Sequence, residues 1–165
     1  MKKLLKYLDK FEEIVSCTAF SVMVLAIVFN VFLRYLTNKS LKGAEEISYL
    51  GFTWAVFFGI CSLYKNNALI AIGVVVDRLA VKSKRRVHIF TFALVTISNV
   101  IMIYYSATLA VQAWDRPTSS LRIPYFFMDI PATIAFIILT YYSLRFLIMA
   151  FKGKTIEEAN LEDQY

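Results

Sequence analysis

Side chains that could catalyse a reaction are scarce in this sequence. His88 is the single histidine, and the two cysteines, Cys17 and Cys61, form no CxxC pair and have no histidine cluster nearby. A bis-histidine haem site needs several histidines inside the membrane, and a quinone-linked disulfide oxidase needs cysteine pairs. The sequence contains no zinc-protease helix, nucleophile elbow or phosphate-binding loop. We therefore predict that this chain has no catalytic residue, no metal site and no cofactor, and that it is not an enzyme.

Charged side chains are missing from the interior of the apolar stretches. Four such stretches occur, and none carries Asp, Glu, Lys or Arg near its middle. A charge at the centre of a bilayer costs about 2.5–3.5 kcal/mol on insertion scales, and pumps and proton-coupled carriers accept that cost because the charge moves or binds substrate. The chain by itself is therefore predicted to have no substrate-binding residue and no ion path.

The composition predicts that lipid surrounds most of the chain. Of its 165 residues, 59% are hydrophobic and 18% are charged, whereas a soluble domain has about 45–50% apolar and about 25% charged residues. A soluble domain of this size could not bury so much apolar surface. The formal net charge of +6 is assigned to topology and anionic headgroups, with no nucleic-acid partner, because the basic residues lie between the apolar stretches.

The apolar stretches predict a single all-α membrane domain, residues 1–151, with four transmembrane helices. Residues 14–33 contain no charge, and at about 1.5 Å per residue they span a hydrocarbon core of about 30 Å. The segment before them carries Asp9, Glu12 and Glu13, and no small-residue cleavage site follows, so we interpret this stretch as a retained helix. The predicted spans cover residues 14–35, 46–65, 87–114 and 131–151, with Pro131 in the first turn of the last span.

The basic residues predict the orientation. They are concentrated in the N-terminal segment, in the connection between spans two and three, and after span four. The positive-inside rule therefore places both termini in the cytoplasm. Residues 152–165 are polar and are expected to form a cytoplasmic tail.

Two segments are expected to be short amphipathic helices on the cytoplasmic surface. In the first, Leu4, Leu5, Leu8 and Phe11 recur at helical spacing among lysines; the second covers residues 67–81. The second segment could rest on headgroups or dock a partner. The residues expected to hold this cytoplasmic surface are Asp77, Arg78, Lys84, Arg85 and Arg86.

Small residues follow one face of the second span. Gly51, Ala55 and Gly59 are four residues apart, which allows another helix to approach closely. That helix could belong to this chain or to another membrane protein. The other candidate helix-packing or interface residues are Trp54, Asn30 and Asn99, and the two amides could alternatively contact a substrate.

Charged residues gather where spans one and two meet outside the cytoplasm. Arg34 and Tyr35 end the first span, and Glu45 and Glu46 open the second, where a helix N-terminus favours anions. A pair between Arg34 and a glutamate would lock this hairpin. The same residues could instead dock an extracytoplasmic partner.

Several short motifs occur in an order that resembles one family of membrane proteins. They are Asn30-Val31-Phe32-Leu33-Arg34-Tyr35, Ala44-Glu45-Glu46, Trp54 followed by Phe57 and Gly59, Val76-Asp77-Arg78-Leu79, and Ile123-Pro124. With these motifs on four spans, the chain resembles the small membrane subunit, the DctQ-like component, of tripartite ATP-independent periplasmic (TRAP) transporters. The resemblance covers nearly the whole chain.

The resemblance implies a multi-pass subunit in a bacterial inner membrane. Its partners would be a large elevator-type membrane subunit, a periplasmic substrate-binding protein and membrane lipids. The large subunit would bind sodium and drive secondary active symport of an organic acid, such as a C4-dicarboxylate or sialic acid. This chain would be a fixed scaffold beside it.

Two other functions stay open at the level of sequence. A self-sufficient, homo-oligomeric small carrier would also have four helices, but small drug–proton antiporters use a membrane-embedded glutamate that these spans lack near their middle. A membrane redox protein is the second alternative, and the few histidines and cysteines argue against it.

Overall fold

The computed structural model describes residues 2–37, 41–65 and 81–152, which are almost entirely helical. Within these residues the chain forms α1 (Lys2–Thr37), α2 (Lys42–Lys65), α4 (Val81–Gln112) and α5 (Phe126–Lys152). Each contains a segment long and apolar enough to cross a membrane: Lys10–Thr37, Gly43–Lys65, Arg86–Gln112 and Phe126–Phe151. The predicted all-α membrane protein with four transmembrane helices is confirmed.

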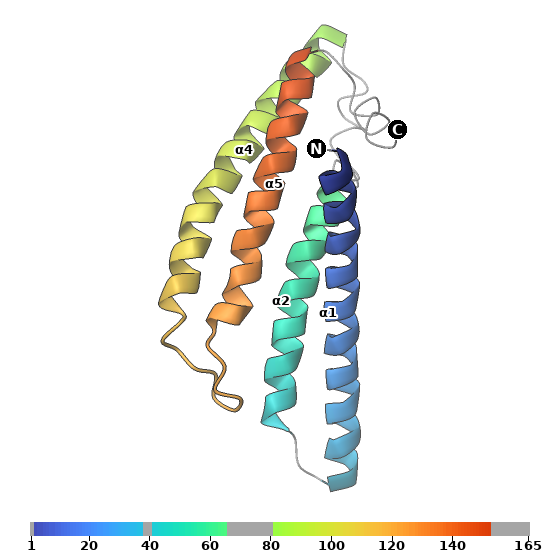
Figure 1. The fold of residues 1–165 in the computed structure, drawn as a ribbon, viewed down its shortest axis with the longest axis vertical. Helices are drawn as coiled ribbons and strands as arrows, with labels where there is room; N and C mark the ends of the chain where they lie inside the picture. The colour runs from blue at the N-terminus through green and yellow to red at the C-terminus, as the bar shows by residue number, and fades with distance from the viewer. Residues whose placement is uncertain (1, 38–40, 66–80, 153–165) are drawn as a thin grey trace.

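The helices stand side by side in an order that differs from their order in the sequence. Across the molecule the order is α4, α5, α2, α1, and the extensive contacts are those of α1 with α2, α2 with α5, and α5 with α4 (Figure 1). The two hairpins, α1–α2 and α4–α5, are therefore joined along α2 and α5. These two helices lie in the middle of the row, while α1 and α4 form its edges.

The two ends of this row differ in what they contain. At one end, which we call the terminal end, α1 begins and α5 ends (Figure 1). At the other, which we call the hairpin end, lie the α1–α2 connection and residues 113–125, which connect α4 to α5. Because the number of spans is even, the start of α1 and the end of α5 lie on the same side of a membrane.

The amphipathic N-terminal segment is continuous with the first span instead of forming a separate surface helix. α1 runs unbroken over 36 residues, because no Gly or Pro interrupts the sequence from Lys2 to Thr37. At about 1.5 Å per residue it is about 54 Å long and must extend beyond a hydrocarbon core of about 30 Å. The predicted surface helix at 67–81, with Asp77 and Arg78, and the tail after Lys152 lie outside the described residues, apart from Val81.

Helix α5 begins at Phe126, five residues before the predicted start of the fourth span, so that Pro131 lies inside the helix. Proline has no N–H, so it cannot bond the carbonyl of Phe127 four residues earlier. The indole Nε1–H of Trp54 on α2 donates to that carbonyl over 3.0 Å. A neighbouring helix thus supplies the donor that α5 lacks, which permits the earlier start.

The contact between Trp54 and Phe127 predicts a coupling between Trp54 and Pro131. Trp54→Phe removes the donor and should lower the free energy of unfolding by about 0.5–1.5 kcal/mol, because the carbonyl of Phe127 loses one hydrogen bond. In a Pro131→Ala background the loss should be smaller, since the alanine introduced at position 131 can donate to the same carbonyl. Unfolding of the four variants of this double-mutant cycle in mild detergent measures the coupling. Equal losses in both backgrounds would contradict the assignment.

Candidate functional site

The connection between α4 and α5 is a tightly folded hairpin. Pro117 and Pro124 form an isolated antiparallel bridge. The N–H of Thr118 donates to the carbonyl of Ile123 over 2.8 Å, and the N–H of Ile123 donates to Oγ1 of Thr118 over 3.1 Å. At its tip Arg122 has a φ of 54°, in the left-handed region that residues other than glycine rarely adopt. The connection therefore presents a fixed shape.

Glu46 fastens this connection to α2. The N–H of Ser120 donates to Oε1 of Glu46 over 2.7 Å, and the N–H of Leu121 donates to Oε2 over 2.8 Å. Hydrogen bonds to an ionised carboxylate are stronger than those between neutral groups. The side chain of Leu121 also lies over Gly43, where an added Cβ would come within 3.3 Å of it. The N-terminal part of α2 thus holds the tip of the α4–α5 connection.

The other residues predicted for the outer surface are placed differently from the expectation. Both carboxylate oxygens of Glu46 accept backbone N–H groups of the α4–α5 connection, so this glutamate fastens that connection and does not lock the α1–α2 hairpin through Arg34. Asn30 closes the α1–α2 hairpin instead, because its Oδ1 accepts the N–H of Leu41 over 3.0 Å. Arg34, Tyr35 and Glu45 are exposed at the hairpin end.

The small residues of α2 face α1 of the same chain. An added Cβ on Gly51 would lie 2.9 Å from the carbonyl oxygen of Ala19 and 3.0 Å from Cβ of Met23. The hydroxyl of Ser16 donates to the carbonyl of Ala55 over 2.9 Å. At Gly59 an added Cβ would meet only Oγ of Ser16, at 3.2 Å. Of the two interpretations of this face, the structure has helix packing inside the chain.

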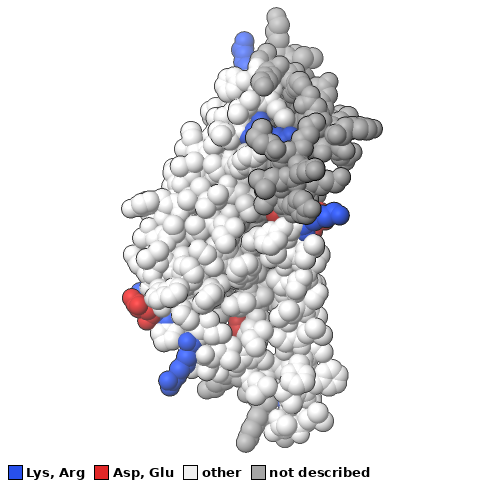
Figure 2. Space-filling model, in the orientation of Figure 1, with Lys and Arg blue, Asp and Glu red and all other residues white. Residues whose placement is uncertain are grey.

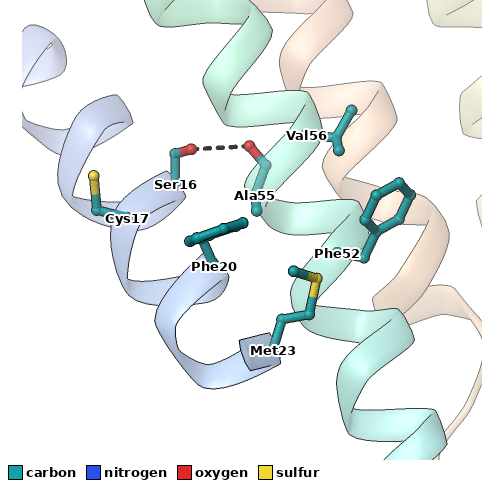
Figure 3. Close-up of a pocket in the computed structure, with 7 residues that line it drawn as sticks. All are labelled: Ser16, Cys17, Phe20, Met23, Phe52, Ala55 and Val56. Carbon is teal, nitrogen blue, oxygen red and sulfur yellow. Dashed lines mark hydrogen bonds between the residues drawn. The ribbon is translucent and has the colours of Figure 1, made fainter. Parts of the chain in front are cut away.

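The pocket beside this contact is apolar. Figure 3 shows Ser16 reaching the carbonyl of Ala55, with Phe20 and Met23 of α1 directed toward α2. The pocket has a volume of about 280 Å³, and none of the residues that line it is charged. A second, larger groove near the hairpin end is also lined by uncharged residues. Neither offers the positive groups that recognition of a carboxylate requires.

Glu12 is the residue whose role the sequence analysis missed. It is fully buried between helices, and its Oε1 accepts the hydroxyl of Tyr142 on α5 over 3.2 Å. The sequence alone places it just before the uncharged stretch of the first span. The sequence does carry a signal for this burial. Glu12, Ser16, Ala19 and Met23 follow one another at intervals of four, three and four residues, and the last three face α2. The face of α1 that packs inside the chain therefore includes Glu12.

The α4–α5 hairpin contains the predicted residues Asn99, Lys84, Arg85 and Arg86, together with other polar side chains. Oγ1 of Thr96 and Oγ of the fully buried Ser143 are hydrogen-bonded across α4 and α5. The ring of His88 stacks on Phe92 at 6.0 Å, which is a packing role. Asn99 is largely buried on α4 and makes no hydrogen bond to a described residue. Lys84 and Arg85 lie in the first turns of α4, and Arg86 is exposed.

The charged side chains of the described residues leave a broad uncharged surface. Figure 2 shows Lys, Arg, Asp and Glu in small patches toward the ends of the helices, with white surface between them. Many large apolar side chains are exposed on this molecule, including Leu25, Phe29 and Ile97 at 62–68% exposure. Such a surface is compatible with lipid tails or with another membrane protein, and not with water.

Four apolar spans with uncharged grooves between them define a multi-pass membrane protein. The sequence model for the DctQ component of tripartite ATP-independent periplasmic transporters matches residues 23–153, and the chain belongs to this family. It is thus a small permease subunit in the bacterial inner membrane. The resemblance stated from the motifs is confirmed.

Two proteins of Haemophilus influenzae are similar to this chain. One is 26% identical over 133 residues, which is 81% of each chain. The other is 30% identical over 79 residues, which is 48% of this chain and 49% of the relative. Both carry the provisional name of TRAP transporter small permease protein.

The bonds of Glu46 predict how the α4–α5 connection responds to substitution. Glu46→Gln keeps one acceptor oxygen and turns an N–H₂ group toward an amide donor, so at least one of the two backbone bonds must be lost. We expect the amide hydrogens of Ser120 and Leu121 to exchange at least tenfold faster. Hydrogen–deuterium exchange measures this, and Glu45→Gln, which removes the same charge one residue away, is the matched control. Unchanged exchange in Glu46→Gln would contradict the role of this carboxylate.

The close approach at Gly51 predicts opposite effects of alanine at two glycines. Gly51→Ala forces α1 and α2 apart, because the new Cβ meets backbone, and should lower the free energy of unfolding by about 1–3 kcal/mol. Gly59→Ala meets only a side chain that can rotate and gains helix propensity, so it should be neutral or slightly stabilising. Unfolding in detergent compares the two variants. Equal effects would show that the backbone contact at Gly51 is unimportant.

Proposed function

We propose that this chain is the fixed scaffold of a TRAP transporter. It packs beside a large elevator-type membrane subunit that takes up an organic acid, such as a C4-dicarboxylate or sialic acid, together with sodium. The observation that carries this proposal is that the family match covers a chain whose described pockets are lined by uncharged residues. A bound carboxylate needs charge-assisted partners, and these grooves lack them. The substrate and the sodium ions then bind in the partner subunit.

The hairpin end is proposed to face the periplasm, and the terminal end to face the cytoplasm. The concentration of Lys and Arg around the terminal end supports this orientation. The periplasmic surface then includes the α4–α5 connection fixed by Glu46, together with the exposed Arg34, Tyr35 and Glu45. A rigid loop with exposed side chains of both signs is a suitable docking surface for the periplasmic binding protein.

A scaffold must resist movement while its partner moves. The contacts that fix this chain internally are Trp54 with Phe127, Gly51 with Ala19, and Glu12 with Tyr142. Together they join α1 to α2, α2 to α5 and α1 to α5. This internal bracing supports the proposed mechanical role.

Reconstitution tests the proposed function. Proteoliposomes holding the large subunit and this chain should take up the organic acid when the loaded binding protein and an inward sodium gradient are supplied. Omitting this chain should lower the initial uptake rate at least tenfold, because the large subunit loses its fixed support. Full uptake without this chain would refute the scaffold role. Uptake by this chain alone would instead favour the self-sufficient carrier.

A further inference from the structure

One stripe of α5 is exposed even though α5 lies in the middle of the helix row. Ile137, Tyr141, Leu144 and Ile148 are 47–52% exposed. They recur at intervals of four, three and four residues, so they share one face of the helix. Across a bilayer this stripe is covered either by lipid tails or by another membrane protein.

Tyr141 places a hydroxyl near the middle of this stripe. At about 1.5 Å per residue it lies about 22 Å along the axis from Phe126 and about 15 Å from Phe151, the ends of the span. Side chains on a helix lean toward its N-terminus. Tyr141 therefore leans away from the nearer end of the span and toward the centre of the membrane, unlike the interfacial tyrosines of an aromatic belt.

The hydroxyl of Tyr141 makes no hydrogen bond to any residue that the structure describes. The antiparallel helix α4 carries a second such group at the same depth. Thr96 on α4 is hydrogen-bonded to Ser143 on α5, and because the two helices are antiparallel, Ser98 lies level with Tyr141. Ser98 is exposed, and its hydroxyl likewise makes no hydrogen bond to a described residue. Hydrocarbon offers a hydroxyl no partner, and an unpaired polar group there is costly. Lipid tails alone are thus a poor neighbour for this part of α4–α5.

Near the middle of their spans, the exposed surfaces of the other hairpin lack this feature; the exposed Thr18 on α1 lies nearer the terminal end, about 12 Å from Lys10. α1 has the most apolar span of the four, and Ser21, the hydroxyl nearest the middle of that span, donates to the carbonyl of Cys17 over 2.8 Å. Tyr49 on α2 is exposed, but it lies near the N-terminus of its helix and leans toward the hairpin end, where water and headgroups can bond it. Lipid tails are therefore sufficient neighbours for the middle of these surfaces.

We propose that the exposed stripe of α5 is the surface on which the large membrane subunit packs. This inference rests on the proposed function and names the face that performs it. The occupant is a transmembrane helix with a hydrogen-bond acceptor at mid-membrane depth, which receives the hydroxyl of Tyr141. α1, at the opposite edge of the row from α4, faces lipid.

Site-specific photocrosslinking in the intact complex tests the proposal. A benzophenone amino acid replaces Tyr141 or Leu144 on α5, and Leu25 or Phe29 on α1 in matched controls, which are equally or more exposed. Irradiation of the complex in native membranes should join this chain to the large subunit from the α5 positions and not from the α1 positions. Crosslinks to the large subunit from α1 alone, or crosslinks between two copies of this chain from α5, would overturn the proposal.

A second measurement separates the hydrogen bond from general packing. Tyr141→Phe keeps the ring and removes the hydroxyl, and should weaken recovery of the large subunit in detergent about threefold, as expected for one interhelical hydrogen bond. Tyr49→Phe should leave recovery unchanged, and equal effects of the two variants would overturn the donor role. If the large subunit never co-purifies with the unmodified chain, the proposed function itself fails, which is a different result from a misplaced crosslink.

Discussion

Backbone polar groups inside a bilayer must find partners within protein, and this constraint explains the central contact of the fold. Pro131 deprives the carbonyl of Phe127 of its usual donor within α5. The indole of Trp54 replaces it from α2. In water such a carbonyl could bond solvent, but where the span enters hydrocarbon it needs a partner within protein. The proline therefore makes α5 dependent on α2, and this dependence joins the two hairpins at the middle of the row.

The remaining helix contacts follow from the absence of a hydrophobic force between helices in lipid. Close backbone approach and hydrogen bonds must substitute for it. At Gly51 the backbone of α1 comes so near that no Cβ fits, and Ser16 adds a hydroxyl bond to the carbonyl of Ala55. Between α4 and α5, Thr96 and Ser143 serve the same purpose. The hydroxyls of Ser16, Thr96 and Ser143 therefore hold helices together.

The sequence was sufficient for the features that depend on composition and period. The four spans, the family and the small-residue face of α2 all follow from local patterns. Which group a polar side chain bonds could not be predicted from the sequence. The pairing of Glu46 with backbone amides 74 and 75 residues away, in place of Arg34, depends on how the two hairpins meet. The start of α5 was misplaced for the same reason, because the donor that tolerates Pro131 is on another helix.

The burial of Glu12 shows how a charged residue can belong to a scaffold without belonging to a transport path. It lies near the terminal end of α1, away from the middle of the span, and its carboxylate is joined to Tyr142 across the interior. This is a side-chain bond from α1 to α5, which are otherwise separated by α2 in the helix row (Figure 1). Glu46 makes the corresponding bond from α2 to the α4–α5 connection at the hairpin end. The two hairpins are thus tied by a carboxylate at each end and by Trp54 between them, so a force on one hairpin is passed to the other. A subunit that braces a moving partner requires that property, whereas a carrier that must itself open and close would be hindered by it.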